Sequence, residues 1–243
     1  MKTLSSLQHP LVKRLVQLRK ERKARLREGS VVIEGRKLVV ENAGLVRTLL
    51  TTGKETHLSL PENAEAFTVT PEIIQKISGV KSPEGILAEV EIPKLELPKQ
   101  LRRLLVLENL NDPGNLGTLI RTSLAFGWDG VFLLGDCCDP YNDKAVRASK
   151  GAVFHLPIVS GDIKSLKTLL SELEISVLIA DLEGQEVSKV PMLSSLALVL
   201  GSEAHGPSDE VLSMGNAVTI PISQNLDSLN VAVAGGILLY HLS

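Results

Sequence analysis

The sequence lacks any apolar run long enough to span a membrane, and its first residues lack the apolar core of a secretory signal peptide. It also has few cysteines. Cys137 and Cys138 are adjacent, which suits neither the spacing of a metal site nor a disulfide framework. With 243 residues, 44% hydrophobic and 22% charged, the chain is typical of a globular protein with one large or two small domains. We therefore expect a cytoplasmic protein with two ordinary thiols.

The common nucleotide-binding motifs are absent as well. No G-x-G-x-x-G motif follows a predicted strand. Residues 201–208 have the glycine spacing of a phosphate-binding loop, but Pro207 stands where that loop requires a lysine. His205 lies in the same segment without a serine nucleophile elbow, and a single loop histidine is more often structural than catalytic. The sequence therefore supports neither a conventional dinucleotide site nor a triphosphate site.

The charge is unevenly distributed. The formal net charge is −2, yet basic residues crowd one short N-terminal segment, where only Glu21 and Glu28 oppose them. Two interpretations remain open: a solvated helix face, or an arm that binds the phosphates of a nucleic acid. The basic residues are Lys13, Arg14, Arg19, Lys20, Arg22, Lys23, Arg25 and Arg27.

The apolar pattern predicts two domains. Residues 4–27 are predicted to form one basic helix, and strands then alternate with helices as far as residue 90. Residues 92–100 contain two prolines, no glycine and no apolar periodicity, which is typical of an extended connector. We therefore assign residues 1–92 to a first domain, 93–100 to a linker and 101–243 to a second domain.

The second domain contains short apolar segments that alternate with predicted helices. Strands that are apolar throughout and alternate with helices predict an α/β fold, with a mostly parallel sheet covered on both faces. The predicted strands are residues 104–107, 131–134, 154–159, 177–180, 196–200 and 217–220.

Three loops that follow strands, at residues 107–117, 198–208 and 220–230, are rich in glycine and polar residues. Ligands bind at the carboxyl ends of strands in such sheets. In the last loop Ser228 is placed to cap the final helix, whereas Asn230, in an otherwise apolar first turn, needs hydrogen-bonding partners. The small residues that follow predict close approach of another backbone, from this chain or from a second one.

The three loops together resemble the ordered motifs of the SpoU (TrmH-like) RNA ribose 2′-O-methyltransferases of the SPOUT superfamily. The matching segments are Asn-Asp-Pro-Gly-Asn115-Leu-Gly117 through Arg121, Leu-Gly201-Ser-Glu203-Ala-His-Gly206, and Ile-Pro221 through Ser228-Leu-Asn230. Upstream, His9-Pro-Leu-Val-Lys13 and Glu34-Gly35-Arg36 resemble the accessory RNA-binding domain of many members, which is similar to ribosomal protein L30e. The resemblance covers almost the whole chain.

The resemblance implies a trefoil knot in the second domain, S-adenosylmethionine as cofactor in the knotted loops, RNA as substrate, a homodimer with shared active sites, and no metal. Its catalytic positions are Asn115, Arg121, Glu203, Ser228 and Asn230. Its cofactor-binding positions are Leu200, Gly201, Gly206, Ile220, Ile222 and Leu229. The predicted RNA-binding residues are Lys13, Arg14, Arg19, Lys20, Arg22, Lys23 and Arg36.

The role of Arg121 stays open between two alternatives. The family resemblance gives it the part of general base, but an arginine is protonated at all ordinary pH values. The alternative is that it grips the phosphate beside the target ribose, while a phosphate oxygen or water accepts the proton. Ser228 and Asn230 would then orient Arg121 and the ribose, and Glu203 would brace its loop.

The sequence departs from the family pattern in the cofactor loops. Ala204 replaces a common glycine, Pro207 a common leucine, and Gln224 another common glycine. The first functional hypothesis is methylation of a ribose 2′-hydroxyl in ribosomal RNA. A transfer RNA substrate, and a non-catalytic RNA-binding module on the same fold, are the alternatives.

Overall fold

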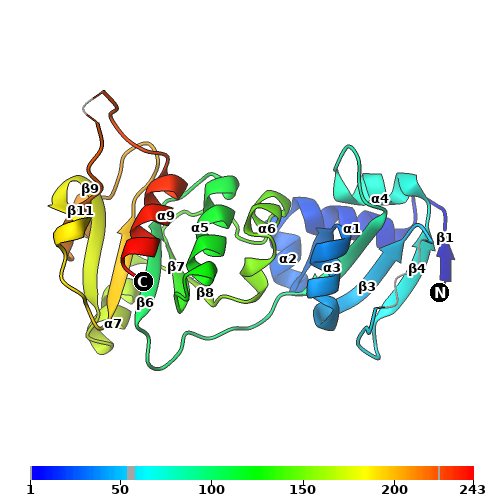
Figure 1. Ribbon diagram of the computed structural model, residues 1–243. Helices are drawn as coiled ribbons and strands as arrows, with labels where there is room; N and C mark the ends of the chain where they lie inside the picture. Colours follow the sequence, from blue (N-terminus) through cyan, green and yellow to red (C-terminus); the bar gives the residue numbers. More distant parts are fainter. Residues whose placement is uncertain (1, 54–57, 224) are drawn as a thin grey trace. The chain divides into compact units, whose positions relative to one another are not determined.

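The computed structural model describes residues 2–53, 58–223 and 225–243. The chain folds into two compact units, Met1–Pro93 with Tyr141–Phe154, and Lys94–Pro140 with His155–Ser243 (Figure 1). The division after Pro93 falls where the sequence predicts the connector. Residues Tyr141–Phe154, which the sequence places within the second domain, pack in the first unit.

The first unit contains a five-stranded mixed sheet. Its elements are β1 (Lys2–Leu4), α1 (Pro10–Lys20), α2 (Arg22–Glu28), β2 (Ser30–Glu34), α3 (Arg36–Glu41), the 3₁₀ turn η1 (Ala43–Leu45), β3 (Val46–Thr51), β4 (Glu65–Val69), α4 (Pro71–Ser78), β5 (Ile86–Glu91), α6 (Asp143–Ser149) and the 3₁₀ turn η2 (Ala152–Phe154). The strand order is β1-β4-β3-β5-β2, in which β5 runs antiparallel to both of its neighbours. Leu15, Leu18 and Ile73 belong to the core between the helices and this sheet.

The single basic helix predicted for residues 4–27 is wrong. The chain breaks at Glu21, whose backbone is extended, and so forms α1 and α2. Arg25, 3% exposed, donates hydrogen bonds from its guanidinium to the carbonyls of Leu18 and Arg19 at 2.6 and 2.8 Å. These carbonyls lie in the last turn of α1, where helix acceptors lack intrahelical partners. Arg25 thereby stabilises the end of α1.

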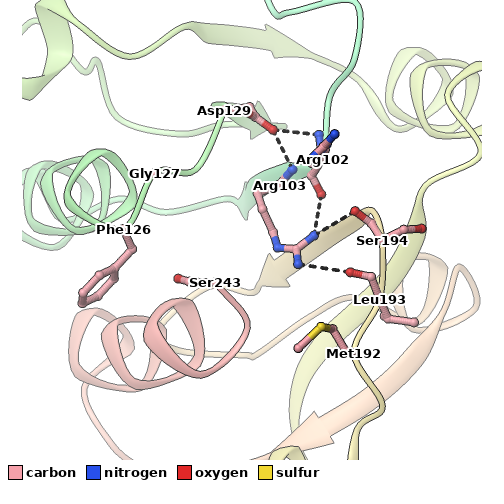
Figure 2. Close-up of a pocket in the computed structure, with 9 residues that line it drawn as sticks. All are labelled: Arg102, Arg103, Phe126, Gly127, Asp129, Met192, Leu193, Ser194 and Ser243. Atoms are coloured by element: carbon pink, nitrogen blue, oxygen red, sulfur yellow. Dashed lines mark hydrogen bonds between the residues drawn. The ribbon is translucent and has the colours of Figure 1, made fainter.

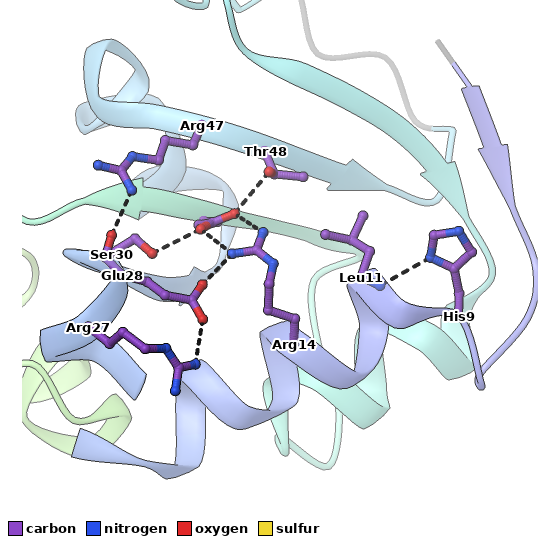
Figure 3. A network of polar contacts seen from close by, with 9 residues as sticks. His9, Leu11, Arg14, Arg27, Glu28, Ser30, Arg47 and Thr48 are labelled. Carbon is purple, nitrogen blue, oxygen red and sulfur yellow. Dashed lines mark hydrogen bonds and ion pairs between the residues drawn. The ribbon is translucent and has the colours of Figure 1, made fainter. Parts of the chain in front are cut away.

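A buried charge network joins α1 to the sheet (Figure 3). The guanidinium of Arg14 donates to both carboxylate oxygens of Glu89 at 2.8 and 2.6 Å, and to Glu28 at 2.6 Å. The hydroxyls of Ser30 and Thr48 each donate to Glu89 at 2.9 Å. Burial raises the pKa of Glu89, but the hydrogen bonds and charge of Arg14, with the two hydroxyls, outweigh burial and leave that pKa below its ordinary value.

The second unit contains a six-stranded sheet in which all pairings are parallel. Its elements are β6 (Arg103–Glu108), α5 (Pro113–Ala125), β7 (Gly130–Leu134), β8 (Ile158–Gly161), α7 (Ile163–Glu172), β9 (Ser176–Glu186), the 3₁₀ turn η3 (Val187–Lys189), β10 (Leu196–Leu200), α8 (Asp209–Leu212), β11 (Asn216–Thr219) and α9 (Val231–His241). The strand order is β11-β9-β10-β6-β7-β8. The predicted parallel α/β sheet is confirmed. The strand predicted at residues 154–159 is displaced, since Ala152–Phe154 forms η2 and the strand begins at Ile158.

The final helix packs on α5 of the same chain, and the two lie side by side in Figure 1. A Cβ at Gly235 would meet the terminal methyl groups of Leu119 and Leu200, so the absence of a side chain lets these two leucines pack against α9. Gly236 faces Thr122. The nearest atoms to both glycines belong to side chains, so close approach of another backbone to this face stays a prediction. None of the helices in the described ranges is long and apolar enough to cross a bilayer.

Arg14→Ala should destabilise the protein by about 2–3 kcal/mol at pH 7. Breaking a buried ion pair costs about 3–5 kcal/mol, and we discount that value because the side chain of Arg14 is 37% exposed. Urea denaturation of the full chain, followed by circular dichroism, measures the loss. Lys13→Ala on the exposed side of α1 is the control, expected to change the free energy of unfolding by no more than about 0.5 kcal/mol.

The same prediction has a pH dependence. A carboxylate with a depressed pKa stabilises the fold above its unfolded pKa of about 4.3, and this contribution is lost as pH falls through the folded value. Arg14→Ala removes the group that lowers the pKa of Glu89. The difference in free energy of unfolding between wild type and Arg14→Ala should therefore become smaller below a pH of about 4.3. An Arg14→Ala protein as stable as Lys13→Ala at pH 7 would contradict the assignment.

Candidate active site

Three loops meet at the carboxyl edge of the parallel sheet. Leu107 of β6 pairs with Leu200 of β10, so the loops that follow these two strands leave the sheet side by side. The loop after β11 leaves the same edge, because β11 runs parallel to its neighbour β9. This edge is where open parallel sheets bind ligands, and the three family-like motifs all begin there.

The first loop is fixed by its own polar side chains. Asp112 caps α5, and its carboxylate accepts a hydrogen bond from the backbone N–H of Asn115 at 2.9 Å. Asn109 has a left-handed backbone (φ 51°), and its side-chain Oδ1 accepts a hydrogen bond from the N–H of Asp136 at 2.8 Å. Asn115 is thereby held in the first turn of α5 with its carboxamide directed at the two other loops.

Asn115 connects all three motifs. Its Nδ2 donates to the carboxylate of Glu203 at 3.1 Å, and its Oδ1 accepts from Nδ2 of Asn230 at 3.2 Å. Oδ1 of Asn230 in turn accepts from the N–H groups of Ala232 and Val233, at 2.9 and 3.3 Å. The hydrogen-bonding partners that the sequence predicts for Asn230 are thus the backbone N–H groups in the first turn of α9 and the side chain of Asn115.

Two of the predicted catalytic residues stand outside this chain of hydrogen bonds. Asn230, not Ser228, caps α9, so the predicted capping role of Ser228 is wrong. Ser228 and Arg121 are both exposed, and within the described ranges neither side chain makes a hydrogen bond with the other or with Asn230. The structure therefore brings Asn115, Glu203 and Asn230 together and leaves Arg121 and Ser228 facing solvent.

The second loop is a compact turn between β10 and α8. Ser202 and Gly206 exchange two backbone hydrogen bonds, at 3.2 and 3.0 Å. A side chain at Gly201 would collide with the backbone of Gly206 and Pro207, and Gly206 has a positive φ of 66°. The loop therefore forms a tight turn with Ala204 and Pro207, two of the residues that depart from the family pattern. The third such residue, Gln224, lies outside the described residues.

The predicted cofactor positions lie in the second and third loops. Leu200 and Gly201 are buried at the end of β10, whereas Ile220, Ile222 and Leu229 are partly buried along the loop between β11 and α9. The two thiols lie near the first loop and are poor nucleophiles. Burial raises the pKa of Cys137, and burial together with neighbouring acidic groups raises the pKa of Cys138 to about 12.

The basic residues of the first unit divide into two groups. Arg14 and Arg25 make the internal contacts described above, and the guanidinium of Arg19 lies against Gly79. The remaining predicted RNA-binding residues are exposed. They are Lys13, Lys20, Arg22, Lys23 and Arg36.

A cavity of about 590 Å³ opens at the opposite, amino edge of the parallel sheet (Figure 2). None of the predicted site residues lines it. The guanidinium of Arg103 donates to the carbonyls of Arg102, Leu193, Ser194 and Leu242 at 2.8–3.3 Å, so its charge is used to hold chain segments together. The candidate active site is at the carboxyl edge, because the polar side chains of Asn115, Glu203 and Asn230 converge there. No cluster of three His, Cys, Asp or Glu residues in the described part of the chain could hold a metal ion.

Comparison with known proteins identifies the family of the chain. A family model described as the SpoU rRNA Methylase family matches residues 102–240, and one described as the MRM3-like substrate binding domain matches residues 9–88. The chain is 31% identical to the 23S rRNA (guanosine(2553)-2′-O)-methyltransferase RlmP of Bacillus subtilis, over 100% of this chain and 99% of that protein. It is 27% identical to the mitochondrial rRNA methyltransferase 3 of Homo sapiens, over 91% of this chain and 69% of that protein.

A solved structure is similar over nearly the whole chain. The AdoMet-bound rRNA methyltransferase from Sinorhizobium meliloti superposes with a TM-score of 0.88 at 28% identity, covering 99% of this chain and 97% of that one. The methylase family model spans more than half of the chain, and the Bacillus relative matches from end to end. The chain therefore belongs to the SpoU rRNA methylase family.

Proposed function

We propose that this protein transfers a methyl group from S-adenosylmethionine to a ribose 2′-hydroxyl in ribosomal RNA. The observation that carries the proposal is the hydrogen-bonded chain Glu203–Asn115–Asn230, which joins the three motif loops at the carboxyl edge of the sheet. The names of the relatives support the substrate, since the Bacillus protein is a 2′-O-methyltransferase of 23S rRNA and the Sinorhizobium structure contains the cofactor.

The second and third loops are suited to hold the cofactor. The loop 201–208 turns so tightly that a side chain at Gly201 would collide with the backbone of Gly206 and Pro207, so glycine is needed for the turn. Leu200, Gly201, Gly206, Ile220, Ile222 and Leu229 would hold the adenine and amino-acid ends. When bound, the cofactor supplies an electrophilic methyl group on a sulfonium.

Arg121 acts on the RNA in this proposal. Its guanidinium is exposed and has no hydrogen bond to the described residues, so its donors are available to a phosphate beside the target ribose. Its permanent charge excludes a conventional role as base, and the ribose proton leaves to a phosphate oxygen or water. Asn115 and Asn230 hold the loops around the ribose, and Ser228, exposed at the rim, orients it.

The first unit binds the RNA that contains the target nucleotide. Its exposed cations at Lys13, Lys20, Arg22, Lys23 and Arg36 supply contacts to the phosphates, independent of sequence. The match of this unit to the MRM3-like substrate binding domain supports the assignment. Arg14 and Arg19 are omitted from the contact set, because both pack inside the unit.

The active enzyme is a knotted homodimer. The support for a knot is the resemblance of the three motif loops to those of the SpoU family, which implies one. The support for a dimer is an exposed apolar strip on α9 and the end of α5, because such strips commonly mark protein interfaces. The strip consists of Val233, Ile237, Tyr240, Leu124 and Phe126.

Methyl transfer tests the proposal directly. The purified protein is incubated with labelled S-adenosylmethionine and with ribosomal or transfer RNA from cells that lack the gene, and the labelled nucleotide is mapped. Label at a ribose of ribosomal RNA is expected. Label on transfer RNA alone would show that transfer RNA, and not ribosomal RNA, is the substrate. Cofactor binding without transfer to either RNA would favour a non-catalytic RNA-binding protein.

Arg121→Ala should lower the rate of methyl transfer by about a hundredfold or more, as expected when a group that positions the substrate for in-line attack is lost. The dissociation constant for S-adenosylmethionine should change little, because Arg121 contacts RNA in this proposal. Arg121→Lys should also be impaired, since an ammonium group cannot reproduce the planar guanidinium. Calorimetric loss of cofactor binding in Arg121→Ala would contradict the assignment.

The triple substitution of Lys20, Arg22 and Lys23 by Gln should weaken RNA binding and flatten its salt dependence. Each lost phosphate contact should lower the slope of log affinity against log salt by about 0.7–0.9. A filter-binding titration in salt measures this slope. The matched control is the triple substitution of exposed Lys164, Lys167 and Lys189 in the second unit, which should leave the slope unchanged. Equal slopes for the two triple variants would identify α1 and α2 as a solvated surface.

Ile237→Asp, at a position 41% exposed in the single chain, should convert the dimer to monomers. A charge buried in an apolar interface without a partner is strongly unfavourable. Light scattering at micromolar concentration measures the mass. Leu182→Asp, at an exposed position on β9, is the control and should stay dimeric. A monomeric wild-type protein would overturn the proposed dimer.

A further inference from the structure

Glu108 is a buried carboxylate that has no part in the mechanism above. It is the last residue of β6 and is 6% exposed. Both of its oxygens accept hydrogen bonds from one residue that lies 100 positions away: Oε2 from the backbone N–H of Ser208 at 2.9 Å, and Oε1 from the Ser208 hydroxyl at 2.6 Å. The two contacts join the end of β6 to the end of the loop that follows β10.

Ser208 has a second task at the same point. Its hydroxyl oxygen accepts a hydrogen bond from the N–H of Val211 at 3.3 Å and so caps α8. The hydroxyl therefore donates to Glu108 and accepts from the helix at once, which fixes its rotamer. One serine thus sets both where the loop ends and where α8 begins.

The loop 201–208 is consequently held at two places by the segment that leaves β6. At its base Ser208 is bonded to Glu108, and near its tip Glu203 is bonded to Asn115. Between these points the chain is closed by the paired Ser202 and Gly206. The base contact determines how the backbone of the loop is presented at the carboxyl edge.

The buried carboxylate of Glu108 is not needed simply to stabilise the fold. A buried carboxylate loses its hydration, and apolar residues of similar volume are often as stable as a buried polar contact. The benefit of a carboxylate is directional, because two short hydrogen bonds to one residue allow a single position of the loop. This geometry is typical of a residue that positions a binding loop.

We infer that Glu108 is a positioning residue for the cofactor loop: through Ser208 it sets the backbone conformation of residues 201–208, and hence the affinity for S-adenosylmethionine. The inference rests on the proposed function, because it assigns the cofactor to this loop. Glu108 itself contacts neither cofactor nor RNA.

The test compares cofactor affinity in Ser208→Ala, Ser208→Thr and wild-type full-length protein by calorimetry. Hydrogen bonds to a charged group are strong enough that Ser208→Ala should raise the dissociation constant for S-adenosylmethionine about tenfold to a hundredfold. Ser208→Thr keeps the hydroxyl and should retain most of the affinity. The KM for RNA should stay unchanged in both. Glu108→Gln, of equal size and without the charge, should fall between Ser208→Ala and wild type.

The matched control is Asp162→Ala, which removes the helix cap of α7 in the same unit. It should lower the melting temperature without changing cofactor affinity. The inference would be overturned by a Ser208→Ala dissociation constant within about twofold of wild type, or by an equal rise in Asp162→Ala. Wild-type protein that binds no S-adenosylmethionine would instead overturn the proposed function itself.

Discussion

The carboxamide of Asn115 is the contact on which the arrangement of the active-site loops depends. An amide has a donor and an acceptor in fixed relation, so it can hold one partner on each side. Asn115 donates to Glu203 and accepts from Asn230, and these two partners come from segments that follow different strands. An aspartate at this position would lose the donor, and a serine would lack the reach. The sheet brings three loops to one edge, and this amide sets their mutual positions.

The basic side chains of the first unit fall into two groups, those with hydrogen-bonding partners inside the protein and those exposed to solvent. Arg14 and Arg25 satisfy a buried carboxylate and the carbonyls of a helix end. Their neighbours Lys13, Arg22 and Lys23 remain exposed. The number of basic residues in the segment does not show which of them are buried and which are exposed. That depends on the face of the helix on which each residue lies.

The sequence predicts most of the fold because the apolar runs of the second unit are continuous and the helices between them are periodic. It fails where side-chain contacts decide a local structure. The break between α1 and α2 is accompanied by the side chain of Arg25, which turns back to the end of α1 and leaves no pattern in residues 4–27. The strand predicted near Phe154 fails because that apolar residue packs in the other unit.

The candidate site is predictable to a similar extent. The resemblance of the three motifs to the family identifies Asn115, Glu203 and Asn230, and the structure brings these side chains together. The sequence favours Ser228 as the helix cap because serine is a common capping residue, yet Asn230 is equally suited and lies nearer the first buried residues of α9. The sequence does not identify Glu108, because one glutamate at a strand end has no recognisable pattern and its partner lies 100 residues further along the chain.

Residues Tyr141–Phe154 belong to the first unit, while the chain on both sides of them belongs to the second. The polypeptide therefore passes between the units three times, and no single cut separates them. A fragment that ends at Pro93 would lack Val146, Val153 and Phe154, which are buried in the intact protein. The unit that resembles a substrate-binding domain is thus not a detachable module in this chain. Exchange of residues 1–93 between relatives by simple recombination would pair each transferred segment with a Tyr141–Phe154 segment from the other parent.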